Sequence, residues 1–510
     1  MVLIDGNNLT IGDVVKVSRY GETVRLTDGA KSSICKSREY VDMLVKEGRV
    51  VYGITTGFGK FSDIPISRHE TEALQKNLIV SHACGTGSHF TEDIARAVML
   101  LRANALAKGF SGIRLETVAA LLDMLNCGVV PAIPEKGSLG ASGDLALLSH
   151  MVLPMLGLGE AYYKGRLMDG GEALKAAGLQ PVSLTSKEGL ALINGTQVMT
   201  AAGALAAYDA LSLVKLSDIA ASLTCEALKS ITDAYLPELH VIRPHKGQMD
   251  TARNMLTILK NSERATHQGE VRTQDPYSLR CVPQIHGASK DAVNYVLQKV
   301  QIEINSVTDN PVILPQLDKA LSGGNFHGQP VALPFDFLGI AAAELAGVSE
   351  RRVEQLVNPD LSGLPPFLTE DGGLCSGFMI AQYAAAALVS ENKVLAHPAS
   401  VDSIPSSANQ EDHVSMGTIA ARKARDIVDN TARVLAIELT AAAQGIDLNK
   451  TDIGKKLGIG TQAAYDVIRK AVSTVEEDRV LYKDFDKVLK LVKSGEIVEA
   501  VEKVTGELLY

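Results

Sequence analysis

The sequence predicts a mainly α protein with a long central helical bundle and a small α/β cap at its N-terminus. Segments rich in Ala, Leu and Val carry apolar residues at helical spacing over 197–230, 286–306, 331–357, 377–396 and 416–444. Strand-like runs between these segments are few and short. Long amphipathic helices bury their apolar faces best against one another, so we expect near-parallel packing in a bundle.

Length and composition indicate a large globular chain rather than a disordered one. At 510 residues the chain exceeds the usual single-domain size, and we expect three regions, 1–200, 201–450 and 451–510. Hydrophobic residues make up 46% and charged residues 21%, close to globular averages. The net charge of −9, with no cluster of Lys or Arg, argues against a nucleic-acid partner.

The cysteine spacing, the N-terminal residues and the uncharged stretches together predict a cytoplasmic protein. The six cysteines show no C-x-x-C spacing, which is typical of reduced thiols. The first residues lack a basic region followed by an apolar run, so no signal peptide is expected. Two uncharged stretches, 189–208 and 372–390, are long enough to span a membrane. Polar interruptions and a high Ala and Gly content favour buried core helices, and we expect no membrane partner.

The remaining elements follow in chain order. Short β-type runs at 23–26 and 50–52 flank a helix near 36–48 and form the cap. Tyr52 begins a glycine-rich loop. The pattern then predicts helices over about 95–108 and 112–126, a hairpin around 162–165 and a more charged helical appendix over 462–510.

The most unusual segment is the loop 134–146, which places three glycines, two serines and an alanine within seven residues between two apolar segments. Glycine opens backbone angles that are closed to other residues, so Ala141-Ser142-Gly143 can bend until the Gly143 nitrogen meets the Ala141 carbonyl carbon. Closure gives a five-membered ring. Loss of water from that carbonyl carbon and from the Ser142 side chain would then give a methylidene-imidazolone, a carbon electrophile that no ordinary side chain supplies.

Other chemistries fit this loop less well. The Walker and dinucleotide-binding glycine patterns are absent, and Ser142 has no G-x-S-x-G setting for acyl transfer. A purely structural glycine loop remains possible for this segment alone. The histidines match no short zinc pattern, so no metal is expected; those considered are His82, His150, His286, His327 and His413.

Several other polar loops adjoin the apolar helices. They cover 274–280, 305–311, 322–329 and 403–416. Polar groups that enter a large apolar body need partners there, so their convergence favours a binding or catalytic site.

Taken with these loops, Gly-Ser-Leu-Gly-Ala-Ser-Gly-Asp-Leu-Ala (137–146) resembles the ammonia-lyases that make their own cofactor, and their histidine-acting branch most closely. The resemblance runs from near residue 52 to the helix beginning near 416. It implies a fumarase/aspartase-like helical architecture and a homotetramer whose sites draw loops from three chains. It also implies a 4-methylidene-imidazol-5-one formed autocatalytically from Ala141, Ser142 and Gly143, with no external cofactor.

The resemblance also implies roles for individual residues. Tyr52 matches the base that takes the β-proton of the substrate, and Arg280 matches the residue that holds its carboxylate, with Tyr277 beside it. Asn194 and Phe326 match pocket residues around the ring.

Two further positions concern the choice of substrate. His82 and Glu411 match the pair that distinguishes histidine-acting members from their aromatic relatives. The implied reaction is elimination of ammonia from L-histidine to give trans-urocanate, the first step of histidine degradation. A tyrosine or phenylalanine ammonia-lyase or aminomutase is the alternative within the family, and a catalytically silent helical assembly protein is the alternative from another class.

Overall fold

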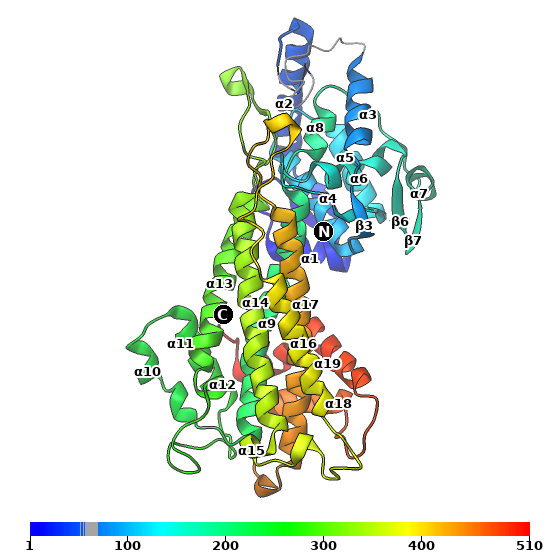
Figure 1. Cartoon of the computed structure of the whole chain (residues 1–510). Coiled ribbons are helices and arrows are strands. Elements are labelled where there is room, and N and C mark those ends of the chain that lie inside the picture. Colours follow the sequence, from blue (N-terminus) through cyan, green and yellow to red (C-terminus); the bar gives the residue numbers. More distant parts are fainter. Residues whose placement is uncertain (52, 55, 57–69) are drawn as a thin grey trace. The chain divides into compact units, whose positions relative to one another are not determined.

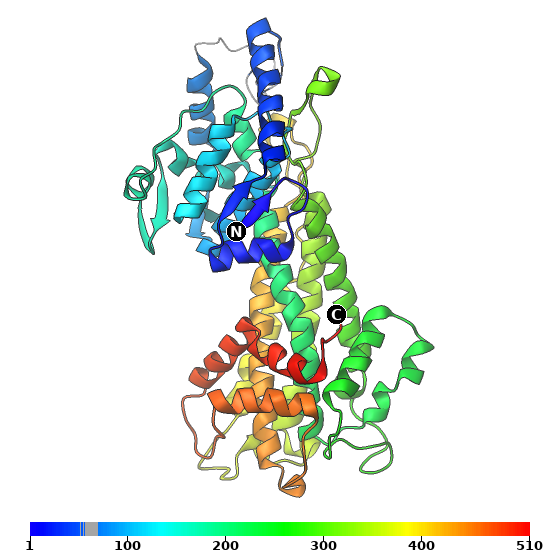
Figure 2. The same ribbon diagram turned by 180° about the vertical axis from the view of Figure 1, so that it is seen from behind.

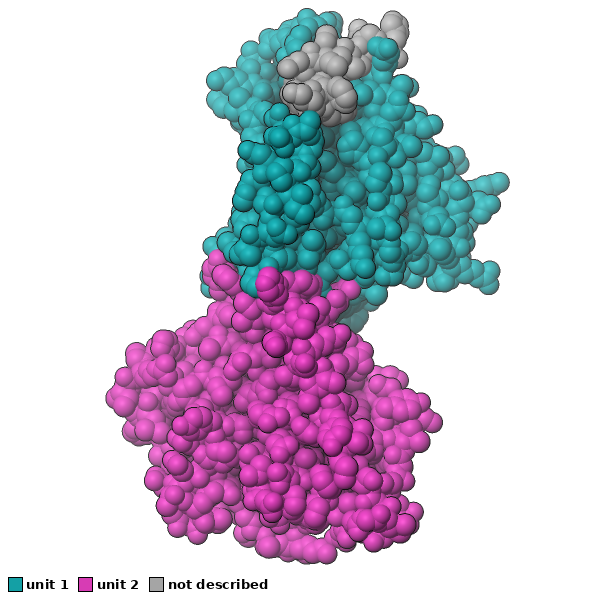
Figure 3. Space-filling view, in the orientation of Figure 1, with its two compact units in different colours: residues 1–205, 297–336, 398–422 teal, residues 206–296, 337–397, 423–510 magenta. Residues whose placement is uncertain are grey.

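The computed structural model describes residues 1–51, 53, 54, 56 and 70–510, and helices dominate it (Figure 1). The mainly α fold with long helices, expected from the apolar spacing, is confirmed. The described chain forms two compact units (Figure 3). Unit 1 comprises Met1–Leu205, Leu297–Asp336 and Pro398–Arg422, and unit 2 comprises Ala206–Val296, Phe337–His397 and Lys423–Tyr510. The division at residues 200 and 450 stays a prediction.

Four long helices each begin in one unit and end in the other. They are α9 (Gln197–Ala227), α13 (Val282–Glu303), α14 (Gln329–Val357) and α17 (Gly417–Leu448). All four lie where the spacing of apolar residues predicts helices. By length and composition alone, α9 and α14 could cross a membrane, but 78% and 67% of their most apolar windows are buried inside the protein. Such burial is typical of core helices.

The N-terminal cap of unit 1 pairs two short parallel strands, β1 (Val2–Ile4) and β2 (Val24–Leu26), near the blue end of the chain in Figure 2. Helices α1 (Ile11–Tyr20) and α2 (Asp28–Glu47) follow the strands. Helix α2 begins eight residues before the predicted start at 36 because the side chain of Thr27 accepts a hydrogen bond from the Ala30 amide and caps the helix. Residues 50 and 51 form no strand.

The rest of unit 1 mixes helices with three small sheets. The predicted hairpin is confirmed as β6 (Glu160–Tyr163) and β7 (Arg166–Asp169). The other elements are α3 (Thr71–His82), β3 (Thr86–His89), α4 (Glu92–Ala107), α5 (Leu115–Cys127), β4 (Val129–Pro131), β5 (Pro134–Lys136), α6 (Leu145–Val152), α7 (Gly170–Ala176), α8 (Glu188–Ile193), β8 (Val312–Leu314) and β9 (Lys319–Leu321).

Unit 2 is a helical body whose C-terminal appendix is helical, as expected. Its further helices are α10 (Pro237–Val241), α11 (Lys246–Ile258), α12 (Tyr277–Arg280), α15 (Pro359–Ser362), α16 (Met379–Leu395), α18 (Ile459–Ala471), α19 (Tyr482–Ser494) and α20 (Glu496–Thr505). Helices α18 and α20 pack side by side, and they are drawn in orange and red in Figure 2.

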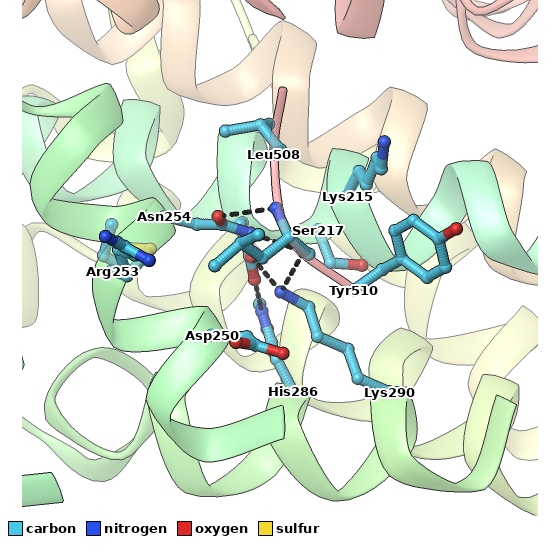
Figure 4. Close-up of polar contacts among 12 residues, drawn as sticks. Lys215, Ser217, Asp250, Arg253, Asn254, His286, Lys290, Leu508 and Tyr510 are labelled. Carbon is cyan, nitrogen blue, oxygen red and sulfur yellow. Dashed lines mark hydrogen bonds and ion pairs between the residues drawn. The ribbon is translucent and has the colours of Figure 1, made fainter. Parts of the chain in front are cut away.

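Charged side chains lie in the core of unit 2 and meet the C-terminal segment there (Figure 4). The fully buried Asp218 pairs with Lys290 at 2.6 Å and with His286 at 2.8 Å. The main-chain oxygen of Leu509 accepts hydrogen bonds from Lys290 at 3.1 Å and from Asn254 at 2.8 Å, and its amide donates to Asn254 at 2.9 Å. The segment 506–510 therefore completes the hydrogen bonding of this cluster.

The prediction that 372–390 forms a buried core helix is wrong for the single chain. Helix α16 begins at Met379, and only Ala381, Ala385 and Asn392 are buried along it. Ile380, Tyr383 and Val394 are exposed by 60%, 59% and 72%. An uncharged, apolar composition is typical of a segment that is covered, but it does not indicate whether its own chain or another provides the cover.

Candidate active site

The glycine loop after β5 is bent at the residues expected to cyclise. Gly140 and Gly143 face each other in an antiparallel bridge, so Ala141 and Ser142 form the tip of a tight turn. Ser142 has a φ of 52° and Gly143 a φ of 72°, both in the left-handed region. A serine in this region stores strain, which persists only where the surroundings enforce it.

Asp144 holds the bent segment in this conformation, although the sequence pattern did not identify it as a site residue. Its carboxylate is fully buried and accepts hydrogen bonds from the hydroxyls of Ser138 and Thr418. It also accepts from the amides of Val198 and Met199 in the first turn of α9, both at 2.9 Å. Burial raises the pKa of Asp144, and these four hydrogen bonds oppose the rise. In the sequence, the position of Asp144 directly before a helix and after a glycine run could have indicated this role.

The chain at Gly195 closes the other side of the loop. Gly143 pairs with Gly195 in a parallel bridge, and the Asp144 amide donates to the Gly195 carbonyl at 2.7 Å. A Cβ at Gly143 would collide with that carbonyl, and one at Gly140 would collide with the Ser415 hydroxyl. Close approach of the Gly195 backbone therefore requires a glycine at 143, and a φ of 79° favours a glycine at 140.

Asn194 directly precedes Gly195 and is almost fully buried. Its Nδ2 donates to the main-chain oxygen of Asn310 at 2.9 Å. The side chain of Asn310 accepts in turn from the Gly323 amide at 2.7 Å, in the loop that carries the half-buried Phe326. The structure thus joins the bent segment, Asn194 and the Phe326 loop within unit 1.

The expected substrate-selecting residues also lie in unit 1. His82 is the last residue of α3, whereas a loop was expected there. Burial lowers the pKa of His82, and the negative charge of Glu411 is close enough to oppose this shift. Glu411 accepts a hydrogen bond from the Ser406 hydroxyl at 3.3 Å. Downstream in the same segment, the Met416 amide donates to the Leu139 carbonyl of the glycine loop at 3.3 Å.

The remaining expected residues lie elsewhere. Arg280 and Tyr277 belong to α12 of unit 2, where the guanidinium carbon lies 4.5 Å from the centre of the Tyr277 ring. Nε of Arg280 donates to the Asp275 carbonyl at 2.8 Å, and its two terminal nitrogens have no hydrogen-bond partner in the described chain. They can therefore grip a carboxylate from outside. Tyr52 lies outside the described residues.

Comparisons with known proteins identify similar sequences over almost the whole chain. The sequence model described as "Aromatic amino acid lyase" matches residues 9–470. The chain is 64% identical over 502 residues to the histidine ammonia-lyase of Alkaliphilus oremlandii and 62% identical over 504 residues to that of Clostridium tetani, and it covers 98% of each. These alignments also include 98% of the present chain.

Solved structures show the same fold. The structure of histidine ammonia-lyase from Trypanosoma cruzi matches with a TM-score of 0.92 at 44% identity, over 99% of this chain and 95% of that one. Tyrosine aminomutase from Streptomyces globisporus matches with a TM-score of 0.95 at 38% identity, over the whole of both chains. Because the family match spans nearly the whole sequence and the relatives align end to end, the chain belongs to the aromatic amino acid lyase family.

Proposed function

We propose that this protein is a histidine ammonia-lyase, which eliminates ammonia from L-histidine to give trans-urocanate, the first step of histidine degradation. The observation that carries the proposal is the left-handed Ser142-Gly143 turn held against Gly195. High identity to relatives named histidine ammonia-lyase supports the choice of substrate. A tyrosine aminomutase shares the backbone equally well, so the backbone alone does not select histidine.

The bent segment suits the formation of the cofactor from the chain itself. Attack of the Gly143 nitrogen on the Ala141 carbonyl carbon, with loss of two waters, converts Ala141, Ser142 and Gly143 into the methylidene-imidazolone. When formed, the group supplies an electron-poor carbon that activates an otherwise unreactive amino acid. Asp144 holds the turn through four donors, and the glycines allow its backbone to approach Gly195.

In the proposed homotetramer, loops from three chains contribute the side chains that orient the amino acid. Arg280 binds the carboxylate, with Tyr277 stacked beside it, and so fixes the β-carbon. His82 and Glu411 provide hydrogen-bond partners for the imidazole. Asn194 and Phe326 line the pocket, and Tyr52 accepts the β-proton, which then accompanies the departing amine as ammonia.

The phenol of Tyr52 gives a direct test of the proton-transfer step. Tyr52→Phe keeps the aromatic ring but removes the acceptor, and loss of a general base costs about 10²–10⁴-fold in rate. The fall is expected in kcat more than in KM, because binding does not need the phenol. Steady-state kinetics on L-histidine measure both. A raised KM with an unchanged kcat would reassign Tyr52 to binding.

Exposed apolar surface on unit 2 supports the homotetramer. On α14, Phe337 and Ile340 are exposed by 42% and 46%, and Ile380 and Tyr383 of α16 are exposed further. Exposed apolar side chains on two long helices are typical of an interface, and a second copy of the chain is the proposed cover. Sedimentation of the purified protein should give a mass near four chains, and a monomer would contradict the proposal. A cytoplasmic location, without membrane or nucleic-acid partners, stays a prediction.

The decisive experiment is to mix the purified protein with L-histidine and follow the absorbance of urocanate. Parallel reactions with L-tyrosine and L-phenylalanine test the alternative within the family, and chromatography of the products distinguishes an aminomutase from a lyase. No turnover of any of the three amino acids would favour the silent assembly protein.

A further inference from the structure

The carboxylate of Asp309 forms a buried ion pair at one end of helix α8 and a hydrogen bond at the other end. Lys187 precedes α8 and Asn194 follows it, and both side chains reach Asp309. Nζ of Lys187 lies 2.7 Å from Oδ2 of Asp309, and both side chains are fully buried. Nδ2 of Asn194 donates to Oδ1 of Asp309 at 3.4 Å. Both oxygens of Asp309 are thus engaged by the residues that flank one short helix.

These contacts select one of the two orientations of the Asn194 carboxamide. Its Nδ2 also donates to the Asn310 carbonyl at 2.9 Å, so both amide hydrogens face acceptors. A flipped carboxamide would direct its oxygen at a carboxylate and a carbonyl, with no hydrogen to share. The observed orientation therefore requires Asp309 to present an acceptor, and the ammonium of Lys187 favours that state.

The other end of the same carboxamide is an acceptor without a donor. Oδ1 of Asn194 is buried, and no donor among residues 1–51, 53, 54, 56 and 70–510 reaches it. A buried polar atom without a partner costs free energy and calls for an explanation. The next residue, Gly195, pairs with Gly143 of the bent segment. An amino acid bound beside that segment brings an amine whose N–H groups can satisfy the acceptor.

We propose that Lys187 and Asp309 are positioning residues that keep Oδ1 of Asn194 turned toward the amine of the bound amino acid, an inference that rests on the proposed function. Lys187 has a φ of 73°, a strained value for a residue with a side chain. Burial lowers the pKa of Lys187, and the charge of Asp309 opposes that shift. The ion pair thus holds a strained residue in the geometry that orients Asn194.

The sharpest test is Asp309→Asn, which preserves shape and removes charge. The new carboxamide gives its oxygen to the charged donor, the ammonium of Lys187, and turns its NH₂ toward Asn194 and toward the Asn310 amide, which donates to Oδ1 of Asp309 at 2.7 Å in the parent. The Asn194 carboxamide then has to flip. Misorientation of a group at the reacting centre costs on the order of 10²-fold, so we expect kcat/KM for L-histidine to fall by about that factor. Intact mass should still show the loss of two waters, because the bent segment is unchanged.

The double variant Asp309→Asn with Lys187→Met separates positioning from stability. Without the ammonium, the new carboxamide can return its oxygen to Asn194, so turnover should recover by about tenfold, the value of one hydrogen bond, while the melting temperature stays low. A merely structural pair would leave the double variant no more active than the single one. Lys290→Met is the matched control: it breaks the equally buried pair with Asp218 in unit 2 and should lower the melting temperature without changing kcat/KM.

Binding in the Ser142→Ala background provides a readout that needs no turnover. Adding Asp309→Asn should weaken calorimetric binding of L-histidine by about tenfold, the loss of one hydrogen bond, and leave binding of imidazolepropionate, which lacks the amine, unchanged. Equal weakening of both ligands, no weakening of either, or failure of the Asp309 variant to lose two waters would overturn the inference. Absence of urocanate formation by the parent protein would instead defeat the proposed function.

Discussion

Ser142→Ala is expected to abolish nearly all turnover while the fold and the oligomeric state persist. Alanine has no hydroxyl to lose, so the exocyclic carbon of the methylidene-imidazolone cannot form. Removal of a group that makes the covalent electrophile is expected to cost more than about 10³-fold in kcat. The loss is chemical rather than structural, since Ser142 lies at the tip of the turn and Asp144 still ties the segment to α9.

Mass measurement separates this explanation from a folding defect. If the ring forms from the chain as proposed, the parent chain purified without any helper enzyme should be lighter than its sequence mass by two waters. The Ser142→Ala chain should not lose the water that comes from the side chain. Matched melting curves would show that the fold is intact. An unmodified mass in active parent protein, or activity of the variant within tenfold of the parent, would show that the electrophile is not made here.

L-Phenylalanine is expected to be a negligible substrate, and L-tyrosine nearly so. An imidazole that leaves water needs hydrogen-bond partners, and His82 and Glu411 lie close enough to interact in unit 1. Burial lowers the pKa of His82, which favours the neutral ring that can both donate and accept. A site built to hydrogen-bond its substrate rejects an analogue without those groups by about 10⁴–10⁵-fold. Ratios of kcat/KM for the three amino acids measure this selectivity.

Variants of the same two residues show which of them selects the substrate. His82→Leu should cost about 1–3 kcal/mol in histidine turnover, the penalty for one unpaired buried group. Glu411→Gln keeps a hydrogen-bonding side chain and removes the charge, so a large loss would give the carboxylate a role in proton transfer or in binding a cationic imidazole. If the parent deaminates tyrosine or phenylalanine as fast as histidine, these residues are not the selectors and the alternative within the family replaces the present proposal.

Local sequence was sufficient for features that depend on neighbouring residues. The bend at the segment proposed to cyclise was predictable because Gly140 and Gly143 permit backbone angles that other residues avoid, and the structure bends there. The long helices followed from apolar spacing. The start of α2 was misplaced because its cap, Thr27, lies nine residues before the predicted start at 36.

Other features depend on partners far away in the chain. Asp144 is held by residues of α9 and α17, more than 50 positions downstream, and Lys187 meets Asp309 across 122 positions. The spacing of residues along the sequence does not indicate such long-range contacts. The exposure of α16 was not predicted for a related reason. The hydrophobic composition of a helix is the same whether its own chain or another chain covers it.

The docked C-terminal segment has a consequence for biosynthesis (Figure 4). Lys290 and Asn254 find their last hydrogen-bond partners in Leu509, which the ribosome adds after every other residue of this cluster. Until Leu509 has been added, Lys290 and Asn254 therefore lack these hydrogen-bond partners. A bundle with unpaired buried polar groups is poorly stable. Unit 2 is then expected to complete its core only after residue 509 has left the ribosome, so its helices have to be shielded from aggregation until then.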